Sequence, residues 1–178
     1  KKFQVVTTPI VTNPLLISDT ILCHSQMIDI TVQNSENNVF YILRKTGSQQ
    51  TFGSSMPGNG NNVLLTSNSI NAEGDYYLEA SNNLASCTAN FPPFSIVVER
   101  TLANFHVGLI NAEQNEPTPF YQQCSEASNF LWSFSNQPYN PTSDLADPAV
   151  SFLENGQSIV NLIAWSDNGC YDSIEKPG

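Results

Sequence analysis

The chain has 178 residues, of which 40% are hydrophobic and 12% charged, and sixteen acidic against six basic side chains give a formal net charge of −10. Such a chain repels nucleic-acid phosphates and anionic lipid headgroups, so neither partner is expected. No apolar run approaches the roughly 20 residues of a membrane-spanning helix, so direct membrane insertion is not expected either. Two histidines leave little material for metal or acid–base chemistry. We therefore expect no enzyme.

Short β-rich runs separated by clusters of Asn, Gly, Pro and Ser follow one another through the first hundred residues. Strands are predicted at 28–32, 39–43, 63–65, 74–80 and 94–98, with a loop at 53–62. A strand every 8–12 residues is typical of a β-sandwich. Because no 3.6-residue apolar stripe is sustained, helices should be short or absent.

A second set of strands begins near residue 102. Its predicted strands are 105–107, 119–121, 130–134, 149–152 and 158–165, with a loop at 139–148. Between the two sets, residues 100–101 lack Gly and Pro, which indicates a short junction and not a flexible linker. The sequence thus predicts an all-β chain of two tandem β-sandwich domains, 1–101, with an N-terminal linking strand at 1–14, and 102–178.

Four cysteines permit three disulfide pairings. Only the pairs Cys23–Cys87 and Cys124–Cys170 keep each bridge within one predicted domain, so we expect one intradomain disulfide in each. Disulfides persist in oxidising compartments, which favours an extracellular location. Zinc ligation is disfavoured because the sequence has no C-x₂-C spacing.

Residues 15–98 contain Thr20-Ile21-Leu22-Cys23, Phe40-Tyr41-Ile42-Leu43 and Glu73-Gly74-Asp75-Tyr76-Tyr77-Leu78-Glu79-Ala80, followed by Cys87. This region resembles the Ig-like domains of large secreted surface proteins of Bacteroidota. In that family the early cysteine pairs with one just past the Gly-x-Tyr strand. Tyr41 takes the place of the strand-C tryptophan, and Tyr76 stands where a tyrosine corner is expected.

Residues 102–176 resemble a PKD-type sandwich. The central W-D-F-G-D motif is Trp132-Ser133-Phe134-Ser135-Asn136 here, so both acids and the glycine are replaced. Later matching segments are Phe152-Leu153-Glu154-Asn155-Gly156, Val160-Asn161-Leu162-Ile163-Ala164 and Asn168-Gly169-Cys170. These motifs identify an architecture and leave the function open.

The two resemblances imply a non-catalytic extracellular module, a spacer or adhesive segment of a large bacterial cell-surface protein. Type 9-secreted gliding-motility adhesins are the best-known proteins with such arrays. The alternative is a carbohydrate-binding accessory module of a secreted glycan-degrading enzyme. The chain begins at Lys1 without an initiator methionine, so we expect a piece of a longer protein. The expected partners are neighbouring domains of that protein, surface glycans or other proteins.

One predicted strand carries apolar residues on both faces. If Val160, Leu162 and Ala164 face the core, the pleat turns Ile159, Asn161, Ile163 and Trp165 outward. Such an outer face indicates a covered or binding surface. Three readings remain open: a neighbouring domain or loop covers it, a glycan stacks on Trp165 with Tyr139 or Tyr171, or a protein partner binds there.

Two weaker predictions concern Ca²⁺ and sugars, and no other cofactor is expected. Carboxylates at Asp144 and Asp147, and at Asp167 and Asp172, could supply oxygen ligands for Ca²⁺, although the absence of EF-hand spacing favours a solvated acidic surface. Asp19-Thr20-Ile21 and Asp172-Ser173-Ile174 resemble the short O-glycosylation acceptor of Bacteroidota, with Thr20 and Ser173 as the modified residues.

Overall fold

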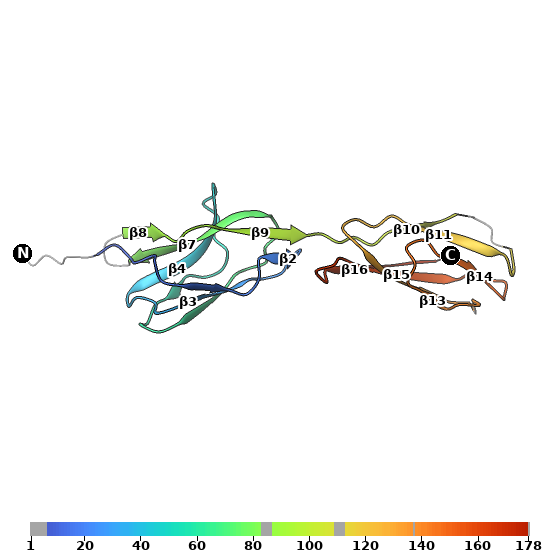
Figure 1. Cartoon of the computed structure of the whole chain (residues 1–178), viewed down its shortest axis with the longest axis horizontal. Helices are drawn as coiled ribbons and strands as arrows, with labels where there is room; N and C mark the ends of the chain where they lie inside the picture. Colours follow the sequence, from blue (N-terminus) through green and yellow to red (C-terminus); the bar gives the residue numbers. More distant parts are fainter. Residues whose placement is uncertain (1–6, 83–86, 109–112, 137, 178) are drawn as a thin grey trace, which may run out of the picture. The chain divides into compact units, whose positions relative to one another are not determined.

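The computed structural model describes residues 7–82, 87–108, 113–136 and 138–177, and the chain divides into two compact units, Lys1–Val98 and Glu99–Gly178. All elements in the described part of the chain are β-strands, which confirms the all-β prediction (Figure 1). No helix within those ranges is long and apolar enough to cross a membrane.

The first unit contains two sheets. The smaller sheet has the order β1 (Leu15–Ile17), β3 (Asp29–Val32), β6 (Val63–Thr66). The larger sheet has the order β2 (Ile21–Cys23), β9 (Phe94–Glu99), β7 (Gly74–Asn82), β4 (Val39–Lys45), β5 (Met56–Pro57), and β8 (Cys87–Asn90) also pairs with β7 (Figure 1). The chain changes sheets between β1 and β2, where the Asp19 carboxylate accepts the N–H groups of Thr20 and Ile21 and fixes the turn.

The core of the first unit contains two buried tyrosines whose hydroxyl groups are both hydrogen-bonded. Tyr76 donates to the Ala72 carbonyl at 2.6 Å, the geometry of the predicted tyrosine corner. Tyr41, at the position of the missing tryptophan, accepts the Glu36 N–H at 2.9 Å. Burial is the main cause that raises the pKa of both phenols above 10.0.

The second unit also contains two sheets, in the orders β10-β11-β14 and β13-β12-β15-β16. The strands of the first are β10 (Phe105–Val107), β11 (Pro117–Gln122) and β14 (Ala149–Ser151). Those of the second are β12 (Asn129–Phe134), β13 (Thr142–Ser143), β15 (Ile159–Trp165) and β16 (Tyr171–Pro177).

An aromatic cluster fills the core of this unit. Trp132 is fully buried, lies 5.1 Å from Phe105 between ring centroids, and donates its indole N–H to the Leu145 carbonyl at 2.9 Å. Phe120 and Phe134 complete the cluster, with their ring centroids 5.0 Å apart. The tryptophan of the PKD-like motif is therefore a core residue.

Residues 99–101, which include the expected junction 100–101, form hydrogen bonds to residues of the second unit. Thr101 donates its hydroxyl to the Glu126 carbonyl, the Arg100 N–H donates to the Glu126 carboxylate, and the Glu99 carboxylate accepts the Ser166 hydroxyl. At the other end of the chain, residues 7–14 of the expected linking strand form no strand. Residues 1–6 lie outside the described residues.

The expected disulfide in each domain is wrong, since the disulfide-bonded cysteines are Cys23 and Cys170. Cys23 ends β2, which lies next to β9, and β9 in turn pairs with the Gly74 end of β7. Cys87 pairs with Asn82 at the other end of β7. At about 3.3 Å per residue, that strand separates the two cysteines by far more than the roughly 7 Å a disulfide can span.

Cys124, the expected disulfide partner of Cys170, contacts a different part of the unit. Cys124 is a half-buried thiol that lies 3.4 Å from the Asn104 carbonyl oxygen, beside the start of β10. Cys170 is buried in the turn between β15 and β16, where its N–H and carbonyl are both hydrogen-bonded to Ser166. Cys124 thus lies beside the sheet that contains β10, whereas Cys170 lies beside the sheet that contains β15 and β16.

We expect Tyr76→Phe to lower the free energy of unfolding of the chain by about 1–2 kcal/mol, because it leaves the Ala72 carbonyl without its donor. Urea unfolding at neutral pH measures the loss. Tyr77→Phe, on the opposite face of β7, is the matched control and should stay within about 0.5 kcal/mol of wild type. Equal losses in both variants would contradict the assigned tyrosine corner.

Alkaline pH should destabilise the first unit. The unfolded chain releases its phenolic protons near 10.0, whereas Tyr41 and Tyr76 keep theirs in the folded state because burial raises the pKa of both. This stability is fully present below pH 10 and declines as pH rises from there through the folded-state values. Urea midpoints at a series of pH values should show a shallower decline in Tyr41→Phe. An unchanged slope would contradict this origin.

Candidate functional site

The outward face of β15 is where the pleat predicts it. Val160, Leu162 and Ala164 are buried, whereas Ile159 is 49% exposed. The remaining outward residues, Asn161, Ile163 and Trp165, are half-buried. This strand therefore presents apolar side chains to both sides of its sheet.

The neighbouring strands extend this apolar surface. Ile163 pairs with Leu131 of β12, which is 41% exposed, and Trp165 pairs with Tyr171 of β16, which is 75% exposed. Directly opposed residues of antiparallel strands point to the same face. We call these four side chains, Leu131, Ile163, Trp165 and Tyr171, the outer patch.

Polar and acidic side chains border the outer patch. Asn129, opposite Trp165, donates to the Ser128 hydroxyl at 3.0 Å, and that hydroxyl donates to Asp167 at 2.5 Å. In the row beyond Ile163, Asn161 pairs with Glu175, which is exposed. The border therefore carries carboxylates at two of its sides.

The other tyrosine considered for this surface lies elsewhere. Tyr139 is 76% exposed, and its N–H donates to the Ser151 carbonyl of β14, which belongs to the other sheet. It follows the Phe134 end of β12, whereas Trp165 pairs with Asn129 at the opposite end. Only Tyr171 joins Trp165 on the outer patch.

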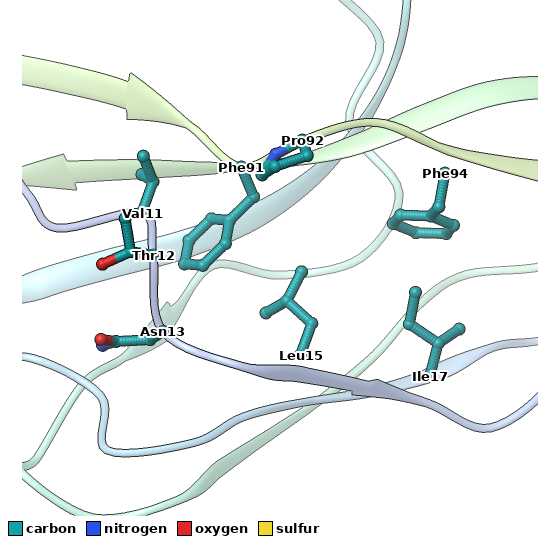
Figure 2. A pocket seen from close by; sticks show the side chains of 8 residues that line it. All are labelled: Val11, Thr12, Asn13, Leu15, Ile17, Phe91, Pro92 and Phe94. Atoms are coloured by element: carbon teal, nitrogen blue, oxygen red, sulfur yellow. The ribbon is translucent and has the colours of Figure 1, made fainter.

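The first unit has an apolar pocket of about 490 Å³ that the sequence did not predict. Figure 2 shows Phe91 and Phe94 on one side and Leu15 and Ile17 of β1 on the other, with Val11, Thr12, Asn13 and Pro92 completing the lining. β1 is an edge strand of its sheet, so the pocket lies where one side of the sandwich is open. None of its described lining residues is charged.

The four carboxylates considered for Ca²⁺ have separate roles. Asp147 accepts the Gln122 N–H at 2.9 Å, Asp172 accepts the Ala103 N–H at 2.9 Å, and Asp167 accepts the Ser128 hydroxyl. Asp144 is exposed in the loop after β13. Among the described residues no three His, Cys, Asp or Glu side chains gather as a metal site would require.

The two candidate glycosylation residues are exposed. Thr20 lies in the turn between β1 and β2, and its carbonyl accepts the Val97 N–H. Ser173 lies on β16 opposite Ile163, so its side chain adjoins the outer patch. Modification of these hydroxyls stays a prediction.

Neither histidine stands in a catalytic arrangement in the described contacts. His24 Nδ1 lies 3.1 Å from the Ser25 hydroxyl in an exposed turn, and that hydroxyl donates to Asn71. His106 stacks on Tyr121, with ring centroids 5.1 Å apart.

No protein-family model and no curated protein matches the chain. Among solved structures, the C-terminal 282-residue fragment of intimin, in complex with the intimin-binding domain of the translocated intimin receptor, gives a TM-score of 0.52 at 12% identity. The match covers 92% of this chain and 62% of that fragment, so the chain spans less than two thirds of its length.

Two further structures are similar at lower scores. The Yersinia pseudotuberculosis adhesin InvE gives a TM-score of 0.38 at 12% identity, over 96% of this chain and 60% of the adhesin. The fibronectin(III)-like modules of Clostridium thermocellum CbhA give 0.34 at 16%, over 91% and 92%. The likeness to intimin shows the fold: Ig-like β-sandwich domains in tandem.

We expect the two faces of β15 to differ sharply in their sensitivity to truncation. Leu162→Ala should lower the free energy of unfolding by about 2–5 kcal/mol, because it opens a cavity beside Trp132. Ile159→Ala, on the exposed face, should lower it by less than about 1 kcal/mol. Urea unfolding measures both changes. Similar losses at the two positions would contradict the assigned faces.

Proposed function

We propose that the chain is a non-catalytic extracellular module that acts as a spacer or adhesive segment of a larger bacterial cell-surface protein. The observation that carries the proposal is the tandem Ig-like architecture shared with the intimin fragment over 92% of the chain. Disulfide-bonded Cys23 and Cys170 fit an oxidising location outside the cell.

The mechanism proposed for a spacer is mechanical. Two sandwiches with separate apolar cores maintain their length because bending either would break strand pairing. The second unit, with ten acidic and two basic residues between 99 and 178, resists self-association by charge repulsion. Exposed side chains on such a frame remain available to partners.

The finer assignments extend this proposal. The Ig-like and PKD-type resemblances support a type 9-secreted protein of Bacteroidota, with gliding-motility adhesins as the model. The two sets of predicted strands support domain limits at 1–101 and 102–178, and the short Asp-Thr/Ser-apolar acceptor segments support O-glycosylation at Thr20 and Ser173. The intimin fragment was solved with a receptor domain, and by analogy we propose protein partners beside the neighbouring domains of the parent protein.

One observation favours the alternative, a carbohydrate-binding accessory module of a secreted glycan-degrading enzyme. Trp165 and Tyr171 are directly opposed on an outer sheet face, beside the side-chain amide of Asn129. Aromatic rings bordered by hydrogen-bonding groups are the usual lining of a small-molecule site. The two functions differ in whether a sugar binds.

A glycan array with the full chain, with and without Ca²⁺, tests the choice. We expect no specific signal from the wild type or from Trp165→Ala, with both proteins folded and monomeric, because a spacer or protein-binding module needs no sugar site. Tyr139→Ala is the control for loss of an exposed ring outside the outer patch. Specific binding that disappears only in Trp165→Ala would replace the proposal with the carbohydrate-binding alternative.

A further inference from the structure

The outer patch is apolar, and its surroundings are negatively charged. Among the strands of its sheet, the one basic residue in the described part is Lys176. Lys176 lies in an inward row of β16, donates to Asn104 and to the Phe105 carbonyl, and lies 4.7 Å from the centroid of the Phe105 ring. It therefore contributes no positive charge to the outer face.

The acidic groups, in contrast, are on the side of the outer patch. Glu175 alternates outward with Ser173 and Tyr171 along β16, and Asp167 lies within 3.5 Å of the Asn129 side chain beside Trp165. The whole unit has a formal charge of −8, from ten acidic and two basic residues. Charge complementarity therefore favours a cationic ligand on this face.

Aromatic rings strengthen the preference for a cation. Trp165 and Tyr171 present π-systems to the same face, and the negative face of such a ring attracts an arginine or lysine placed over it. Arginine suits the place best, because its planar group stacks on rings and donates to carboxylates simultaneously. Leu131 and Ile163 provide the apolar half of the contact.

The same charges argue against a second copy as the occupant. Each chain has a formal net charge of −10, so two copies would place like charges around a small contact. Four side chains also make a surface far smaller than a stable protein interface of about 800 Å² on each partner. A short segment of another protein fits this size better than a whole folded domain.

We propose that the outer patch binds a basic segment of a partner protein in which arginine or lysine alternates with apolar side chains. This inference rests on the proposed adhesive function and adds where the partner binds and what chemistry it has. The apolar side chains of the segment cover Leu131 and Ile163, and its basic side chains contact the two rings, Glu175 and Asp167.

Fluorescence anisotropy with the full chain and a labelled peptide of about eight alternating arginines and leucines tests the proposal. We expect saturable binding with a Kd below about 1 mM. The Kd should rise with the NaCl concentration, because salt screens exposed charges. A peptide with glutamate in place of arginine, and one with serine in place of leucine, should each bind at least roughly tenfold more weakly. Equal binding of the arginine–serine peptide would overturn the proposal, since it would show attraction to charge alone.

Matched variants locate the site. Tyr171→Ala should weaken binding roughly fivefold or more, whereas Tyr139→Ala, which removes an equally exposed tyrosine (75% against 76%), should leave it within twofold. Glu175→Lys should weaken binding and reduce its salt dependence more than Glu154→Lys, a change of the same charge outside the sheet. Thermal unfolding confirms that each variant folds.

Equal effects within either pair of variants, or no binding of the arginine–leucine peptide, would overturn the inference. Those results would leave the spacer proposal intact, because the glycan array tests it separately. Conversely, sugar binding that disappears in Trp165→Ala would overturn the proposed function and this inference together.

Discussion

The register between β12 and β15 is the constraint on which the second unit depends. Trp132 opposite Leu162 places both in the core, and the two-residue period of a strand then fixes the direction of every other side chain. Because β15 has apolar residues on both faces, its own hydrophobic pattern does not determine which face packs against the core. The aromatic cluster around Trp132 makes the choice, since with that indole held in the core a slip of one residue would bury Asn161 and Trp165 and expose Leu162.

Strong alternation made parts of this architecture predictable. The strands at 105–107, 130–134 and 158–165 were predicted within one residue of β10, β12 and β15. β16 was missed because its one large aliphatic side chain is Ile174, and four of its seven residues, Asp172, Ser173, Glu175 and Lys176, are polar or charged. This edge strand forms because it pairs with β15 along seven residues. The β-propensity of its own residues does not predict it.

The same distinction separates what was predictable in the outer patch from what was not. Ile163 and Trp165 follow from the pleat of one strand. Their neighbours Leu131 and Tyr171 follow from pairing between strands, which no single segment encodes. The disulfide prediction was wrong for a related reason: membership in one domain says nothing about which end of a strand each cysteine occupies. Cys23 and Cys87 lie toward opposite ends of β7.

Two of the proposals made for this chain compete for one surface. Ser173 is the exposed neighbour of Ile163 on β16 and a candidate for O-glycosylation. A sugar on that hydroxyl would extend over the side chains that a basic peptide segment must contact. The hydrated sugar would thus prevent the segment from packing on Leu131 and Tyr171. Since both cannot occupy the face at once, modified molecules would act as spacers and unmodified ones as binders.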